Sequence, residues 1–169
     1  DSITYGTNNE LEKATAIYSW VQKNIRYVAF ENGLEGFRPR QAGEVCSKRY
    51  GDCKDMSSII TQMLRMAGIQ AHYTWIGTRD IPYRYADVPL PMVNNHMIAS
   101  AFINNSWYFL DGTSPNSTLW LPPAAIQGKQ ALIGIGDSSF EVIEIPVTES
   151  WKNSMEDSTY IHFTANGIA

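Results

Sequence analysis

The sequence predicts an α+β fold in which helices precede an antiparallel β-sheet. Segments 11–25 and 56–67 carry the hydrophobic period of amphipathic helices. The main strand-like segments, 70–77, 93–103 and 106–113, come after both of them. A two-residue connection between the last two segments requires antiparallel pairing, because parallel strands need a much longer crossover.

Length and composition are those of one globular domain. The chain has 169 residues, of which 44% are hydrophobic and 18% are charged. Its net charge is −4 and its basic residues form no run, so we expect no nucleic-acid partner. No apolar stretch reaches the length that crosses a bilayer, so we predict no transmembrane segment.

The first helix is predicted to begin at residues 7–10, because Thr-Asn-Asn-Glu has the spacing of a capping box. We expect it to continue to residue 25. A short extended piece at 26–30 follows, and then a loop at 31–40. Pro39 in this loop disfavours helix at the residue before it.

The second long helix is predicted to place a cysteine in its first turn. Asp52 is the expected N-cap, Cys53 follows it, and Gly68 ends the pattern. The unpaired N–H groups and the positive end of the helix dipole favour a thiolate there, which is the form that attacks carbonyl carbon. Cys53 is therefore a candidate nucleophile. The apolar positions at helical spacing are Met56, Ile59, Ile60, Met63, Leu64 and Ala67.

A hairpin is predicted to join a histidine to an aspartate. Asn104-Asn105 suits a two-residue turn, because asparagine tolerates the left-handed backbone such turns need. This turn places Ile98 opposite Asp111, which puts His96 diagonally across from Asp111 on the same face. A three-residue loop would instead send the two side chains to opposite faces.

The later part of the chain alternates short strands with loops. The Pro-rich segment 78–91 is expected to be irregular, and as a long loop it is a candidate wall of the active site. Short strands are predicted at 131–135 and 140–145, and a lone strand at 159–164.

A lone strand needs a partner, so the tail suggests that further structure belongs with it. We expect a domain over residues 1–150, with 151–169 as an extension or the start of a truncated β-rich domain. The start at Asp1 without methionine suggests a mature form or an excised fragment.

Competing interpretations exist for each candidate residue. Cys53 could be a core thiol, His96 an ordinary strand histidine and Asp111 a turn residue, but their predicted convergence favours catalysis. Metal binding by these three with Cys46 is disfavoured, because six residues separate the two cysteines. We expect both cysteines to be free thiols, with Cys46 on a short helix over 41–49 and packed inward beside Val45.

Several runs together resemble the transglutaminase-like domain of the papain-like cysteine enzyme superfamily, in the form found in larger bacterial proteins. The resemblance covers about residues 10–135. Cys53, His96 and Asp111 match the family triad position by position. The runs are Gly51-Asp52-Cys53-Lys54-Asp55, Met63-Leu64-Arg65-Met66-Ala67-Gly68-Ile69, Asn95-His96-Met97-Ile98 and Trp107-Tyr108-Phe109-Leu110-Asp111-Gly112-Thr113.

The resemblance implies a papain/transglutaminase-like fold, in which a nucleophile helix packs on an antiparallel sheet. It also implies acyl transfer on peptide or glutamine-type amides through a thioester, by a protease, amidase or transglutaminase. The Cys53 N–H would be the first oxyanion donor, with Tyr27, Trp20 or Gln41 as candidates for the second. Lys54 and Asp55 match the family run, but we leave them out of the site as dipole partners and solvated charges.

The resemblance implies a protein or peptide substrate, flanking domains, and an exported, periplasmic or cell-envelope location. The sequence has no acidic loop of the calcium-binding kind, and we expect no cofactor. The alternative function is a catalytically silent binding or scaffold module of a larger envelope protein.

Overall fold

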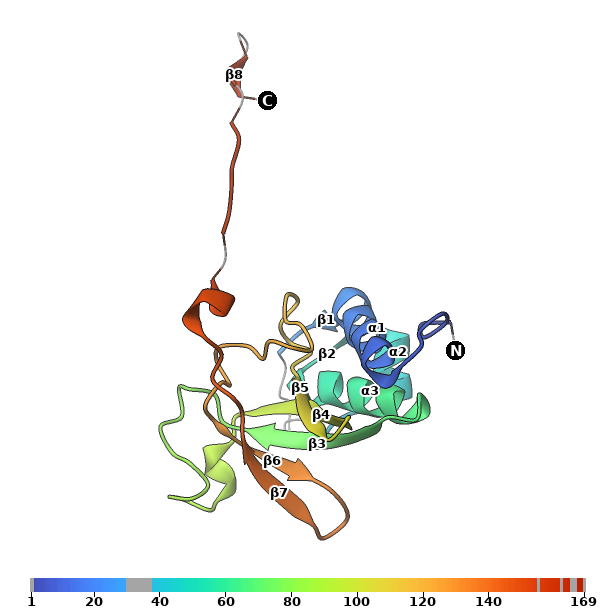
Figure 1. The fold of residues 1–169 in the computed structure, drawn as a ribbon, viewed down its shortest axis with the longest axis vertical. Helices are drawn as coiled ribbons and strands as arrows, with labels where there is room; N and C mark the ends of the chain where they lie inside the picture. Colours follow the sequence, from blue (N-terminus) through green and yellow to red (C-terminus); the bar gives the residue numbers. More distant parts are fainter. Residues whose placement is uncertain (1, 30–37, 155, 162, 165–166, 169) are drawn as a thin grey trace.

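A computed structural model describes residues 2–29, 38–154, 156–161, 163–164 and 167–168. A five-stranded antiparallel sheet in the order β5-β4-β3-β6-β7 forms the centre, and helices α1, α2 and α3 lie to one side of it (Figure 1). The α+β prediction is therefore confirmed. The elements of this body are α1 Glu10–Asn24, α2 Ala42–Lys48, α3 Cys53–Met66, β3 Gln70–Ile76, β4 His96–Ile103, β5 Ser106–Leu110, β6 Gln130–Gly134 and β7 Phe140–Glu144.

Helix α1 begins two residues later than a cap at Thr7 would place it. Asn9 is the N-cap, and its side chain accepts the N–H of Glu12 at 2.9 Å. The Glu12 carboxylate accepts the N–H of Asn8 in return, at 2.7 Å. The prediction of a capping box over residues 7–10 is wrong, because the Thr7 hydroxyl bonds back to Thr4 instead.

Helix α3 has the predicted boundaries. Asp52 is its N-cap, Cys53 is its first residue, and the chain leaves the helix through Gly68 at φ +83°. That left-handed conformation suits glycine, which has no Cβ to clash. The chain then turns directly into β3, so the start of α3 lies toward the end of β3 and the start of β4.

The β4–β5 hairpin has the predicted register. Asn104 and Asn105 both have positive φ, at 50° and 60°, and Ile103 pairs with Ser106. On the other side of β4, His96 pairs with Ile76 of β3. The two-residue turn therefore sets which side chains of β4 and β5 share a face.

Two apolar clusters lie on opposite faces of the sheet. On one face, residues of α1 and α3 such as Ile17 and Ile60 pack on β3 and β4, where the small side chains of Ala71, Ala99 and Ala101 leave room for the helices. The other face is covered by later parts of the chain. Its buried members are Ile76, Ile98, Phe109, Ile126, Ala131, Ile133 and Ile145.

Two short strands place the residues before α3. β1 Arg26–Tyr27 pairs in parallel with β2 Tyr50–Gly51, in the register Tyr27 to Gly51. The predicted loop at 31–40 is described only from residue 38 onward. On α2, Val45 is buried and Cys46 is half-buried, which confirms the inward face predicted there.

The segment 78–91 is irregular, as predicted, and leads into the 3₁₀ helix η2 Pro91–Val93. The tail differs from the prediction. After the 3₁₀ helix η3 Ser150–Asn153, the chain extends away from the body, and only Phe163–Thr164 of the expected strand is a strand, β8, paired with β9 Gly167–Ile168 (Figure 1). Residues 159–161 are exposed and lack a neighbouring strand among the described residues, whereas 162 lies outside them.

Candidate active site

The cap of helix α3 fixes the position of Cys53. Asp52 Oδ1 accepts the N–H groups of Lys54 at 2.9 Å and of Asp55 at 3.1 Å. The Asp55 carboxylate accepts the N–H of Asp52 at 3.2 Å, which completes a capping box. The N–H of Met56 bonds to the Asp52 carbonyl at 2.9 Å. The backbone on both sides of Cys53 is thus held by reciprocal hydrogen bonds.

Among the described residues, the backbone N–H of Cys53 is the one at this cap to which no hydrogen bond is assigned. It is the first N–H of the helix, at the positive end of the helix dipole. A carbonyl oxygen that becomes negative while Cys53 attacks its carbon would find this donor unoccupied.

His96 and Asp111 meet as the hairpin register predicts. His96 Nε2 lies 2.9 Å from Asp111 Oδ2. The other carboxylate oxygen, Oδ1, accepts the N–H of Thr113 at 3.0 Å and its hydroxyl at 2.7 Å. The Tyr18 hydroxyl of α1 donates to the backbone carbonyl of Asp111 at 2.7 Å. The carboxylate is therefore held in one orientation toward the imidazole.

Both Asp111 and Cys53 act on the protonation of His96. Burial alone would lower the pKa of His96, but hydrogen bonds to Asp111 and Cys53, with the charges of both, raise it to about 10. Burial alone would raise the pKa of Asp111, but the hydrogen bond and charge of His96 and the contacts from Thr113 hold it below its ordinary value. With Nε2 on Asp111, Nδ1 is the ring atom that remains for Cys53. This arrangement favours a protonated His96 at neutral pH.

Lys54 and Asp55 are buried, so the expectation of solvated charges is wrong. Lys54 Nζ lies 2.6 Å from Asp52 Oδ2. Arg40 donates to Asp55 Oδ2 from Nε at 3.0 Å and from Nη2 at 2.7 Å, and its backbone N–H reaches Oδ1 at 2.8 Å. A Cβ on Gly51 would lie 2.5 Å from the Cβ of Asp55, so only glycine fits there. The alternating charges around Cys53 were the signal in the sequence that could have indicated these ion pairs, but nothing local in the sequence points to Arg40.

The three candidates for a second oxyanion donor lie in different places. Tyr27 pairs with Gly51, two residues before Cys53. Trp20 lies on α1 beneath the guanidinium of Arg49, and Gln41 lines a separate cavity of about 410 Å³ beside α2. The strand register therefore favours Tyr27.

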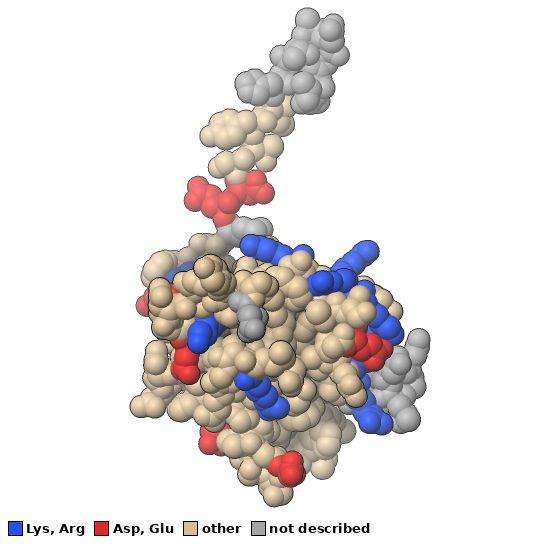
Figure 2. Space-filling view, turned by 90° about the vertical axis from the view of Figure 1, so that its right-hand side faces the viewer, with Lys and Arg blue, Asp and Glu red and all other residues tan. Residues whose placement is uncertain are grey.

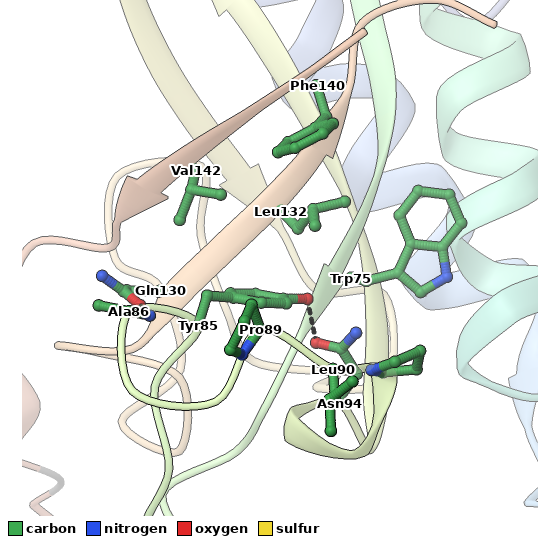
Figure 3. A pocket seen from close by; sticks show the side chains of 11 residues that line it. Trp75, Tyr85, Ala86, Pro89, Leu90, Asn94, Gln130, Leu132, Phe140 and Val142 are labelled. Carbon is green, nitrogen blue, oxygen red and sulfur yellow. Dashed lines mark hydrogen bonds between the residues drawn. The ribbon is translucent and has the colours of Figure 1, made fainter. Parts of the chain in front are cut away.

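The segment 78–91 borders an apolar groove. An apolar groove of about 850 Å³ lies over β3, β6 and β7, with the ring of Tyr85 inside it and its hydroxyl bonded to Asn94 (Figure 3). None of Cys53, His96 and Asp111 lines this groove, and the loop as a wall of the active site stays a prediction. The lining residues are Trp75, Tyr85, Ala86, Pro89, Leu90, Pro91, Asn94, Gln130, Leu132, Phe140 and Val142.

Among the residues that the structure describes, the other titratable groups form no second site of this kind. Both cysteines are free thiols, and within the described residues no three His, Cys, Asp or Glu side chains are arranged to hold a metal. His72 Nδ1 bonds to the carbonyl of Gly134 at 2.9 Å, whereas His162 lies outside the described residues. In Figure 2, basic side chains are scattered over the face shown. No helix in the described part of the chain is both long and apolar enough to cross a membrane.

Two solved structures resemble this fold. A "putative protease" from Parabacteroides distasonis ATCC 8503 matches with a TM-score of 0.65 and 18% identity, over 87% of this chain and 26% of that one. A "putative cysteine protease" from Cytophaga hutchinsonii matches with a TM-score of 0.50 and 20% identity, over 66% of this chain and 34% of that one. The chain thus spans about a quarter to a third of the length of these two proteins.

No curated protein matches the sequence. The family model of the Transglutaminase-like superfamily matches residues 1–112, which include the cysteine, the histidine and the aspartate of the site. The fold and this match agree with the resemblance carried by the sequence motifs. The chain belongs to the Transglutaminase-like superfamily.

Proposed function

We propose that this domain catalyses cysteine-dependent acyl transfer on peptide or glutamine-type amides through a thioester. The observations that carry the proposal are the 2.9 Å contact of His96 with Asp111, the effect of Cys53 on the pKa of His96, and the place of Cys53 at the first position of a capped helix. In this arrangement a base activates the thiol and a carboxylate orients the base.

The reaction follows from the roles of these groups. The thiolate of Cys53 attacks the amide carbon, a C–S bond forms, and the carbonyl electron pair moves to oxygen. When the oxyanion collapses, the C–N bond breaks and protonated His96 gives its proton to the leaving nitrogen. Water or an amine then attacks the thioester, His96 takes the proton of the attacker, and the C–S bond breaks. Water gives hydrolysis, and an amine gives transamidation.

The N–H of Cys53 donates no hydrogen bond within the described residues, which supports its role as the first oxyanion donor. For the second donor we propose the Tyr27 hydroxyl, because β1 runs beside the residues that precede Cys53. Replacement of Tyr27 by Phe is expected to lower kcat by about 10- to 100-fold with little change in KM, since the contact would be made mainly in the transition state.

The second candidate is a binding or scaffold module that does not use this chemistry. The large apolar groove, which excludes the triad residues, is the observation that favours it. In either case we propose a protein or peptide as the partner, residues 1–150 as the domain, flanking domains in the whole protein, and an exported or envelope location.

The pH dependence of alkylation by iodoacetamide separates the two candidates. Cys46 is half-buried like Cys53 and serves as an internal control in the same digest. Catalysis predicts that Cys53 reacts well below the pH at which an ordinary thiol does, and that His96→Ala removes this advantage. If Cys53 and Cys46 titrate alike in the unmodified sequence, the scaffold function is favoured instead.

A further inference from the structure

Helix α3 combines two features with opposite effects on its nucleophile. Asp52 caps the helix, and an acidic cap stabilises a helix start. The same carboxylate is buried one residue before Cys53, where a negative charge opposes formation of a thiolate. Something must therefore offset the charge of Asp52 if the cysteine is to react at neutral pH.

Lys54 is placed to offset the charge of Asp52. Its ammonium lies 2.6 Å from Asp52 Oδ2, and the two side chains are only 8% and 5% exposed. The two oxygens of Asp52 have different partners. Oδ1 accepts the helix N–H groups, and Oδ2 accepts a hydrogen bond from the ammonium. Solvent screens charges this deeply buried only weakly, so Asp52 alone would act strongly on the neighbouring sulfur. Paired with the ammonium of Lys54, it acts there as part of a neutral unit.

The second carboxylate of the first turn is offset in the same way. Asp55 receives two side-chain hydrogen bonds from Arg40, and the pair is also buried. Cys53 is thus flanked by two carboxylates, each with its own cation. The helix dipole and His96 remain as the contributions that favour the thiolate.

We propose that Lys54 is a positioning residue for the nucleophile, whose ammonium neutralises Asp52 so that this residue can cap helix α3 without opposing the thiolate of Cys53. Lys54 acts through Asp52 and has no role in proton transfer. This inference rests on the proposed function, because it assigns Lys54 a task only if Cys53 reacts as a thiolate.

The test is the pH midpoint of Cys53 alkylation by iodoacetamide in a set of charge variants. Lys54→Met leaves Asp52 unbalanced, and the midpoint should rise by about one pH unit. Lys54→Arg keeps the charge and should keep the midpoint. The double variant Asp52→Asn with Lys54→Met removes both charges but retains a capping side chain, and it should return the midpoint close to that of the unmodified sequence.

Asp52→Asn alone provides a test that survives if Lys54→Met does not fold. It removes the negative charge next to Cys53, so the midpoint should fall by up to about one pH unit. Lys48→Met is the matched control, because Lys48 also pairs with a carboxylate, Glu44, but at an exposed position. It should leave the midpoint unchanged.

The outcomes separate this inference from the proposed function. If Cys53 in the unmodified sequence titrates like Cys46, the proposed function itself fails. If Cys53 titrates early but the midpoint stays the same in Lys54→Met and in Asp52→Asn, the triad stands and the role of Lys54 is overturned. A loss of thermal stability in Lys54→Met without a change of midpoint would also overturn it, since that is the result of a purely structural pair.

Discussion

Helices α2 and α3 begin in different ways, although both carry acidic residues in the first turn. The N-cap of α2, Gln41, makes no side-chain cap bond, and its ion pair between Glu44 and Lys48 lies in solvent. At α3, every charged side chain of the first turn is buried and paired. The comparison shows that similar acidic and basic residues can be a solvated surface at one helix and a fixed framework at another, and that burial decides which.

The largest expected difference comes from breaking one ion pair in each region. Arg40→Met leaves Asp55 buried without its cation and should lower the free energy of unfolding by about 3–5 kcal/mol. Lys48→Met removes an exposed partner and should leave the free energy of unfolding nearly unchanged. Urea unfolding of both variants measures this. Equal effects would show that burial does not separate the two pairs.

The pH dependence of stability should also distinguish the site from the surface. The pKa of His96 is raised to about 10, above its ordinary value of 6.5. Its folded-state contacts therefore add stability that is fully present below the ordinary pKa and is lost as the pH rises through about 10. The difference in free energy of unfolding between the unmodified sequence and His96→Gln should shrink over that range. A difference that is constant with pH would contradict the raised pKa.

Glycine replacements sharpen the same comparison. Gly51→Ala would place a Cβ 2.5 Å from that of Asp55 and should destabilise the fold by about 1–3 kcal/mol. Gly43→Ala on α2 meets nothing within 4 Å and should stabilise the fold by up to about 1 kcal/mol, because alanine favours helix. Thermal unfolding measures both. Two changes of the same sign would mean that the space around Gly51 can adjust.

The smallest expected effect concerns the helix caps. Asn9→Ala removes the cap of α1 and should cost about 1 kcal/mol, whereas Thr7→Ala should cost less, because Thr7 lies outside the cap. Gln41→Ala, at a cap with no side-chain bond, should cost close to nothing. Urea unfolding of the three variants measures the order of these costs. If Thr7→Ala costs more than Asn9→Ala, Thr7 is the cap, as expected from the sequence.

Local patterns were enough to predict the body of the fold and the contact of His96 with Asp111. The register of β4 and β5 follows from two asparagines in a turn, and the start of α3 from Asp52 and the spacing of its apolar residues. The error at α1 arose because Thr7 with Glu10 and Asn9 with Glu12 both have the spacing of a capping box, so the spacing alone does not choose between them.

The features that the sequence did not reveal depend on distant contacts. Arg40 lies 15 residues from Asp55, with α2 and β2 between them, and no local pattern in the sequence pairs the two side chains. The pairing of β1 with β2 involves two-residue strands, which are too short to show a period. The burial of Lys54 follows from this packing and could not be inferred from its place next to a helix start.

The central claim is that Cys53 forms a thioester, and the most direct measurement is trapping of that intermediate. The protein would be mixed with p-nitrophenyl acetate, quenched in acid and mapped by mass spectrometry, with His96→Ala and Cys53→Ala alongside. The account predicts one rapidly formed acetyl group on Cys53, which is lost when an amine is added and forms much more slowly in His96→Ala. Acetylation confined to lysines, or equal labelling of Cys46 and Cys53, would contradict it.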